Sequence, residues 1–172
     1  CDVLESVYIP DGVTEIGPYA FFGCDNIGSV RVPGTVTTWG DNAFYLCSGM
    51  ENAVIEDGVP YIGNGAFAYC YKLSDVTIPS SVTAIGNEGF TMTALTDFNW
   101  PENLESIGDY AFHACKLVAV RIPDSVKSIG FNSFSWNEEL KSFTGGTGLK
   151  SVGELAFNNN TAMTDLYMTA DI

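Results

Sequence analysis

One phenylalanine recurs along the whole chain at an almost constant interval. It occupies seven positions, namely Phe21, Phe44, Phe67, Phe90, Phe112, Phe134 and Phe157. Successive members are separated by 23, 23, 23, 22, 22 and 23 residues. A fixed period of this length is typical of a solenoid, in which each repeat is one structural unit stacked on the next. The spacing therefore predicts about seven to eight coils of 22–23 residues each.

Two small residues recur in register with this phenylalanine. The residue just before it is Ala, Gly or Ser in every unit, as expected where one coil lies directly on the next. A glycine stands four residues before it in all seven units: Gly17, Gly40, Gly63, Gly86, Gly108, Gly130 and Gly153. Such a glycine indicates either a left-handed backbone angle or a close approach of neighbouring coils.

Each unit also contains a short segment in which apolar and mostly polar residues alternate, such as Val76-Thr77-Ile78. This alternation predicts a half-buried strand. A proline usually follows at once, and it ends the strand because it lacks an N–H group and has a fixed backbone angle. A second apolar pair comes next, for example Val82 and Ile85. For the segment around the phenylalanine we expect a short helical or 3-10 turn.

One coil by itself buries too little apolar surface to offset the loss of chain entropy, so its neighbours must complete the core. The strands of successive coils should then pair in parallel, about 4.8 Å apart. Units are numbered by their recurring phenylalanine. The seventh unit, that of Phe157, has Gly145-Gly146 where Ile-Pro is expected, and this replacement predicts a loosened strand, with local mobility or a bend.

The repeat resembles the leucine-rich repeats of the BspA-like, Treponema pallidum type. The matching residues are Leu73, Val76, Ile78, Pro79, Val82, Ile85, Gly86 and Phe90, with Ala66-Phe67 and Cys70 supplying the remainder of the motif. The resemblance covers essentially all 172 residues. It implies a leucine-rich-repeat solenoid with parallel β-strands on one face. It also implies a secreted or surface-attached protein, and some members of the family are linked to adhesion to host matrix proteins.

We expect residues 1–172 to form a single solenoid domain, and to be a piece of a longer chain, since neither end shows a polar cap. The sequence contains no run of 18 apolar residues, so it predicts no transmembrane helix, and it shows no signal peptide. The formal charge is −14, from 21 acidic and seven basic residues. Such a surface disfavours nucleic acid and anionic lipid as partners, and is compatible with a basic partner or with simple solubility.

The five cysteines share one slot of the repeat rather than forming a disulfide framework. Cys24, Cys47, Cys70 and Cys115 each follow the recurring phenylalanine by three residues, and Cys1 falls in the same register. The other units place Thr93, Asn137 and Asn160 there. Because Thr and Asn form no disulfides, the slot predicts small polar groups bonded to backbone, and thiols that are free. A bridge between neighbouring coils and a lipid-modified Cys1 are the alternatives.

The sequence offers little for catalysis. Its only histidine is His113, and no recurring slot predicts a partner for it. No Cys-two-Cys pair or glycine-rich phosphate loop is present. We therefore expect no enzyme activity, no metal and no cofactor.

The residues free to vary from coil to coil are those on the outward face of the strands. One predicted column is Tyr8, Arg31, Val54, Thr77, Asn99, Arg121, Thr144 and Tyr167. Its neighbour is Ser6, Ser29, Asn52, Asp75, Asp97, Ala119, Ser142 and Asp165. Extended faces of solenoids are common recognition surfaces. The candidate binding residues are Tyr8, Arg31, Thr77, Asn99, Arg121, Tyr167, Asp75 and Asp97.

Three functions are compatible with this face. The first is a protein-binding or adhesion module whose ligand is a host extracellular matrix or cell-surface protein. The second is a structural spacer that displays another domain. The third is glycan binding, with Tyr8 or Tyr167 stacking on sugar rings. Open coil ends also make end-to-end self-association an expectation for the isolated domain.

Overall fold

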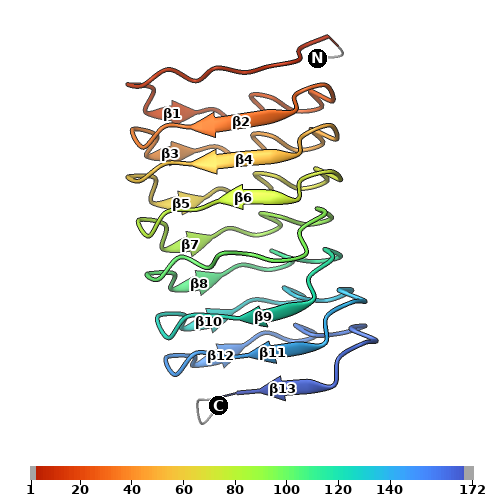
Figure 1. Cartoon of the computed structure of the whole chain (residues 1–172). Helices are drawn as coiled ribbons and strands as arrows, with labels where there is room; N and C mark the ends of the chain where they lie inside the picture. The colour runs from red at the N-terminus through yellow and green to blue at the C-terminus, as the bar shows by residue number, and fades with distance from the viewer. Residues whose placement is uncertain (1–2, 169–172) are drawn as a thin grey trace.

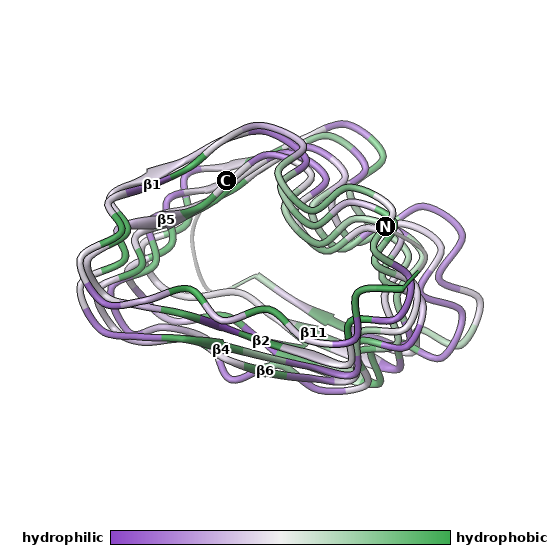
Figure 2. Cartoon of the chain, turned by 90° about the horizontal axis from the view of Figure 1, so that it is seen from above, coloured by the Kyte–Doolittle hydropathy of each residue, from purple (hydrophilic) through white to green (hydrophobic). Residues whose placement is uncertain are grey.

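The computed structural model describes residues 3–168, and these form a solenoid of stacked parallel coils (Figure 1). One long side, here called the strand face, carries β2 (Ser29–Val32), β4 (Asn52–Ile55), β6 (Asp75–Thr77), β9 (Ala119–Arg121), β11 (Ser142–Thr144) and β13 (Asp165–Tyr167). The opposite long side, the second face, carries β1 (Glu15–Ile16), β3 (Thr38–Trp39), β5 (Tyr61–Ile62), β7 (Ala84–Ile85), β8 (Ser106–Ile107), β10 (Ser128–Ile129) and β12 (Ser151–Val152). Figure 2 shows the coils superposed as flattened rings, with the turns around the recurring phenylalanine at one end.

The predicted strands and their parallel register are confirmed in most units, although residues 7–9 of the first unit form no strand. On the strand face, β2, β4 and β6 form one sheet, and β9, β11 and β13 form another. Arg31 lies beside Val54, and Val54 lies beside Thr77, as the predicted column requires. Residues 97–100, which occupy the strand position of unit five, form no strand, so the ladder is interrupted between β6 and β9.

The second face is a ladder that the sequence did not identify as such. The second apolar pair of each coil belongs to a strand of only two residues, and β5, β7, β8, β10 and β12 pair in parallel as one sheet. Ile62, Ile85 and Ile107 follow one another in register and point inward. Most coils therefore pair with a neighbouring coil on both long sides.

The prediction of a short helical turn around the phenylalanine is wrong, because residues 3–168 contain no helix. In the first coil, Ala20, Phe22 and Cys24 donate backbone hydrogen bonds to carbonyls three residues earlier. Tyr19 and Phe21 donate instead to the next coil, to the carbonyls of Asp41 and Ala43. Left-handed φ values recur two residues before and two residues after the phenylalanine, for example at Tyr19 (56°) and Leu46 (61°). Because left-handed residues alternate with right-handed ones, the segment cannot continue as a helix. The N–H groups that do not bond within the turn donate to the neighbouring coil.

The recurring phenylalanines form one continuous stack through the core. Ring centroids of successive members lie 4.9–5.8 Å apart, and their planes differ by 2–20°. These distances lie within the range in which aromatic pairs attract one another. The five inner members are fully buried, and the two end members, Phe21 and Phe157, are partly buried. The core is thus a column of rings flanked by the apolar residues of both faces.

The recurring glycine serves close approach rather than a left-handed angle. None of its seven positions has a positive φ. A Cβ atom at Gly108 would lie 2.6 Å from the backbone nitrogen of Asn87, and one at Gly86 would lie 2.8 Å from that of Asn64. Of the two explanations that the sequence left open, the structure supports the second, except at Gly17 in the first coil, where a Cβ would meet no atom within 4 Å.

The expected loosening at Gly145-Gly146 is not observed. Strand β11, which ends just before these glycines, pairs with both β9 and β13. The Gly145 N–H donates to the carbonyl of Tyr167 at 2.8 Å, which continues the ladder. The irregular coil is unit five instead.

The polar slot filled by cysteine behaves as predicted. The thiols of Cys47, Cys70 and Cys115 donate at 3.1–3.2 Å to the carbonyl oxygens of Phe21, Phe44 and Phe90, one coil earlier. The Asn137 amide donates to the Phe112 carbonyl at 2.8 Å in the same manner. These three cysteines form no disulfide. Cys1, and with it the lipid alternative, lies outside the described residues.

Candidate binding surface

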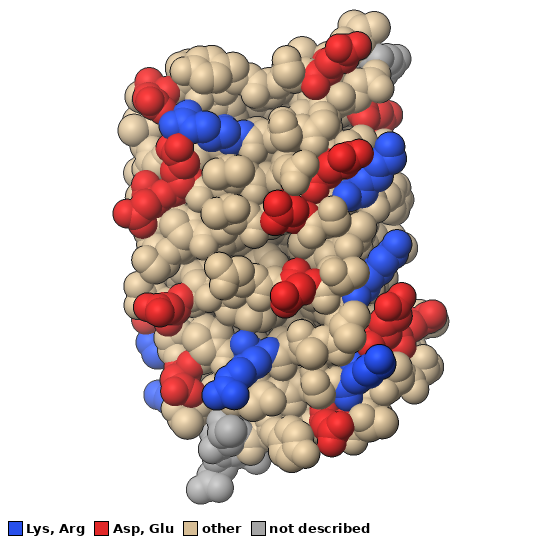
Figure 3. Space-filling model, viewed as in Figure 1, with Lys and Arg blue, Asp and Glu red and all other residues tan. Residues whose placement is uncertain are grey.

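The two predicted outward columns lie side by side on the strand face. Ser29, Asn52 and Asp75 are in register in the sheet of β2, β4 and β6, here called the upper sheet. Ala119, Ser142 and Asp165 are in register in the sheet of β9, β11 and β13, the lower sheet. Figure 3 shows this face with uncharged atoms over much of its centre and charged groups scattered around them. Seven of the eight candidate residues are exposed: Tyr8, Asp75, Thr77, Asp97, Asn99, Arg121 and Tyr167.

The eighth candidate, Arg31, is held by the protein itself. Its Nε and one terminal nitrogen donate to the two carboxylate oxygens of Glu56, at 2.6 and 2.7 Å. The same terminal nitrogen donates to Asp11 at 2.8 Å. These carboxylates raise the pKa of Arg31, Asp11 first and Glu56 second. Glu56 occupies the place where most units have proline, so this exception to the repeat provides a bidentate partner for Arg31.

The interruption at residues 97–100 has a local cause. The Asp97 side chain accepts a hydrogen bond from the N–H of Phe98 at 2.8 Å, and so satisfies a donor that a neighbouring strand would otherwise take. The interval from Phe90 to Phe112 is also one residue shorter than most. Hydrogen bonding to the next coil continues up to Thr96, whose carbonyl accepts from the N–H of Val118.

A hollow of about 290 Å³ opens on the strand face at this interruption. It is lined by Asp97, Phe98, Trp100, Ala119, Val120, Arg121, Ser142 and Thr144. The structure therefore brings together two of the candidates, Asp97 and Arg121, with the column residues Ala119, Ser142 and Thr144. Arg121 is exposed and forms no salt bridge with any residue between 3 and 168, although its charge helps to lower the pKa of Asp124.

Trp100 is the lining residue that the repeat did not predict. Its position in the strand belongs to an inward Ile, yet its ring is only partly buried and lines the hollow. It packs at 5.0 Å on the fully buried Phe112 and at 4.7 Å on Phe98. The signal in the sequence is a large ring in a slot that elsewhere holds Ile, Val, Met or, in unit seven, Gly145.

The remaining candidates are not part of this hollow. Asp75 and Thr77 belong to the upper sheet, beyond the interruption. Tyr8 and Tyr167 lie at opposite ends of the strand face and are 78% and 59% exposed. They cannot contact the same sugar residue.

His113 has a partner, contrary to the expectation from the repeat. Its Nδ1 lies 2.7 Å from the hydroxyl of Ser135, which fills the equivalent position in the next coil. Because that hydroxyl donates to the carbonyl of Asn132 at 2.8 Å, it accepts from His113, which fixes the neutral ring with its proton on Nδ1. Burial lowers the pKa of His113, and the Glu88 carboxylate opposes this effect.

Neither metal ligation nor a membrane span is supported by the described part of the chain. Between residues 3 and 168, no group of three or more His, Cys, Asp or Glu side chains could hold a metal ion. The same residues include no helix of the length and apolarity needed to cross a membrane.

Comparison with known proteins identifies one family. The model of the BspA type leucine-rich repeat region matches residues 1–118 and 83–172, with six copies. A leucine-rich repeat protein from Bacteroides ovatus is 31% identical over 96% of this chain and 44% of its own, with a TM-score of 0.83. The T. pallidum leucine-rich repeat protein is 27% identical over 84% of this chain and 71% of its own, with a TM-score of 0.78.

A third similar structure is a leucine-rich cell surface protein from Faecalibacterium prausnitzii. It is 28% identical over 96% of this chain and 61% of its own, with a TM-score of 0.54. No curated protein matches the chain in sequence. The chain thus spans less than half the length of the Bacteroides ovatus protein.

Proposed function

Because this chain belongs to the BspA-type leucine-rich repeat family, we propose that it is a non-enzymatic module that binds another protein with its strand face. A repeat family of this kind fits an interaction or surface module. The strand face is the part of each coil that can change without disturbing the core, since its outward side chains do not fill the apolar interior.

The hollow at residues 97–100 is the single observation that carries the proposal. It combines an aromatic ring, Trp100, with a guanidinium that is in no salt bridge with residues 3–168, Arg121. Trp and Arg are the side chains most enriched among residues that dominate binding energy at protein interfaces. The exposed Asp97 and the half-buried Ser142 and Thr144 around them provide polar groups for hydrogen bonds with a ligand backbone.

The test is binding to a panel of immobilised extracellular-matrix proteins, measured by surface plasmon resonance. We expect saturable capture by at least one of them. The double variant Asn99→Ser, Arg121→Ser should weaken that capture by roughly tenfold or more. Lys150→Ser removes the same charge from an exposed residue beside the second face and should leave capture unchanged. Undiminished capture by the double variant would eliminate the strand face as the binding surface.

Secretion or surface attachment, and adhesion to a host protein, are the finer parts of this proposal. They are supported by the family and by the description of the Faecalibacterium prausnitzii relative as a cell surface protein. Labelling of intact cells with an antibody to this domain should be positive before permeabilisation. Absence of any saturable binding would favour the spacer function. End-to-end association should appear as a concentration-dependent mass in light scattering.

A further inference from the structure

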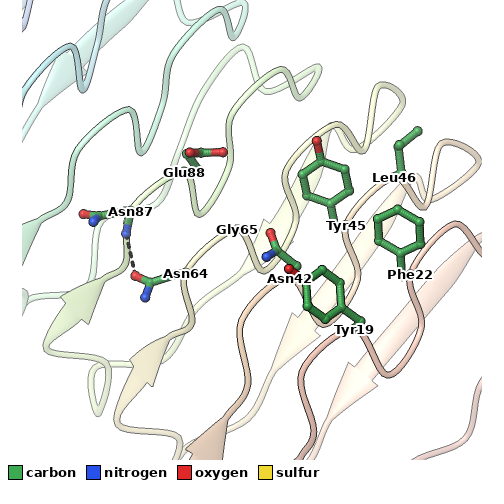
Figure 4. A pocket seen from close by; sticks show the side chains of 9 residues that line it. All are labelled: Tyr19, Phe22, Asn42, Tyr45, Leu46, Asn64, Gly65, Asn87 and Glu88. Carbon is green, nitrogen blue, oxygen red and sulfur yellow. Dashed lines mark hydrogen bonds between the residues drawn. The ribbon is translucent and has the colours of Figure 1, made fainter.

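A second, larger hollow lies away from the strand face, on the side formed by the turns around the recurring phenylalanine, here called the turn side. It measures about 620 Å³, within the range of roughly 300–1,000 Å³ usual for ligand pockets. Its lining comes from four successive coils: Tyr19, Phe22, Asn42, Tyr45, Leu46, Asn64, Gly65, Asn87 and Glu88. Figure 4 shows the aromatic side chains grouped on one side of this hollow and the Asn64, Asn87 and Glu88 side chains on the other.

The aromatic side is a cluster of rings that is partly open to solvent. Phe22 and Tyr45 stack with centroids 5.4 Å apart and planes 9° apart. Tyr19 meets Phe22 edge to face at 5.9 Å. Tyr19 is 57% exposed and Phe22 is 47% exposed, although neither ring is needed to fill the core. Exposed large rings that adjoin a hollow and keep each other in place are suited to hold an apolar ligand surface.

The polar side is a row of amides, of which Asn64 and Asn87 are held by hydrogen bonds. Asn64 accepts a hydrogen bond from the N–H of Asn87 and donates to Asp41, and the Asn87 oxygen accepts from the N–H of Asp109. The amide nitrogen of Asn87 has no partner among residues 3–168. The Asn42 amide group has none there either, and Gly65 makes room for it because a Cβ at that position would collide with it.

The charges of the hollow limit the ligand further. None of its nine lining residues is basic, Glu88 is the only acid, and the whole chain carries a charge of −14. An anionic ligand would therefore be repelled. Amides and tyrosine hydroxyls offer both donors and acceptors, which suits ligand hydroxyl groups because each of these also donates and accepts. A cationic ligand group such as an ammonium only donates hydrogen bonds, so it would leave the donors of the hollow unused.

From these observations we propose that the turn-side hollow binds an uncharged carbohydrate. The C–H face of a sugar ring packs on Tyr19 and Phe22, and its hydroxyls bond to Asn42, Asn87 and Glu88. The site differs in place from Tyr8 and Tyr167, and it does not depend on protein binding by the strand face. A protein of this design could hold a glycan and a protein partner at the same time.

The test is native affinity electrophoresis of the whole chain in gels that contain soluble glycans. The panel comprises the uncharged glycans mannan, galactan, pullulan and mixed-linkage β-glucan, with polygalacturonate as the acidic comparator. We expect at least one uncharged glycan to retard the protein, and polygalacturonate to have no effect. Calorimetry with an oligosaccharide of the retarding glycan should then give a saturable curve.

The variants follow residues that the repeat itself places in equivalent positions. In Tyr19→Asn the new residue is the one that the next coil has there, Asn42, which also has a left-handed φ (58°). Combined with Phe22→Ala, it should weaken glycan binding by roughly tenfold. The control Leu155→Asn changes the same slot in the last full coil, where Leu155 is 47% exposed, and should bind as the wild type does.

Three outcomes would overturn the proposal. They are the absence of retardation by every uncharged glycan, undiminished binding by the double variant with an unchanged circular dichroism spectrum, and preferential binding of an oligo-arginine peptide that Glu88→Gln abolishes. The last result would identify the hollow as a site for basic peptides.

Discussion

At the scale of single residues, the recurring glycine shows how closely the coils approach. A Cβ atom at Gly130 would lie 2.5 Å from the carbonyl carbon of Gly108 and 2.6 Å from the nitrogen of Asp109. Both are backbone atoms of the previous coil, so they cannot move away as a flexible side chain could. The position therefore requires glycine for reasons of space.

We predict that Gly130→Ala destabilises the protein by about 2–3 kcal/mol, as is typical of overpacking in a tight core. The matched control is Gly28→Ala, because a Cβ there meets no atom within 4 Å and the φ value is not left-handed. It should be neutral or slightly stabilising. Urea unfolding followed by circular dichroism measures both, and equal midpoints for the two variants would contradict the close-approach explanation.

The buried thiols make a different prediction, on pH. Burial raises the pKa of Cys115 from 9.0 to about 11, against the weaker opposing effect of its hydrogen bond from Thr93. The folded protein then keeps the proton to higher pH than the unfolded chain does. The stability linked to this thiol is therefore complete below pH 9 and is lost as the pH rises toward 11.

Cys115→Thr tests this linkage, since Thr93 fills the same slot one coil earlier. Between pH 9 and 11, the wild type should lose stability more steeply than the variant, by about 1.4 kcal/mol per pH unit. Urea midpoints at several pH values provide the measurement. Parallel pH curves for the two proteins would show that the thiol is not the group responsible.

At the scale of elements, the aromatic stack is the main internal support. Phe112 is fully buried, with Phe90 and Phe134 on either side at 5.4 and 5.5 Å. It also contacts Trp100 at 5.0 Å, which ties the strand-face hollow to the core. A change in the stack should therefore be felt at the hollow.

We predict that Phe112→Ala costs about 3–5 kcal/mol, as for other buried phenylalanines. Phe22→Ala removes an identical side chain that is 47% exposed and should cost much less. Chemical unfolding gives both values, and tryptophan fluorescence should shift in Phe112→Ala because Trp100 loses its contact. Similar costs for both variants would mean that the stack contributes little beyond surface packing.

At the scale of the whole molecule, each coil contacts only the coils next to it. Within each sheet the parallel strands pair consecutive coils, and the backbone hydrogen bonds of the turn segments also join each coil to the next. In such a solenoid, stability is the sum of coil and neighbour contributions, so removing a complete period should preserve the fold.

Deletion of residues 45–67 removes one full period of 23 residues and joins Phe44 to Ala68 in register. We predict a shorter, folded solenoid with a lower urea midpoint. Its free energy of unfolding should also depend less steeply on urea concentration, because less surface is buried. Deletion of residues 45–55 alone should prevent cooperative unfolding, since it puts every later coil out of register. A folded protein after the shorter deletion, or an unfolded one after the longer, would contradict the modular design.

The repeat determined the architecture because its information is local and is written several times over. Phe90, Ile85 and Val76 each recur in register, and an inward apolar slot at a fixed period admits only stacked coils. The same logic identified the outward column that includes Arg121. It also identified the cysteine slot, because Asn137 and Thr93 share that slot.

What only the tertiary structure decided depends on contacts between coils. Hydrogen bonding to the next coil converts the turn segment from an expected helix into alternating left-handed residues such as Tyr19, and pairing makes a strand of Ala84–Ile85. Glu56 engages Arg31, and the Asp97 side chain interrupts the ladder beside Trp100. The sequence places these groups in coils, but distances of a few ångströms between coils determine which of them meet.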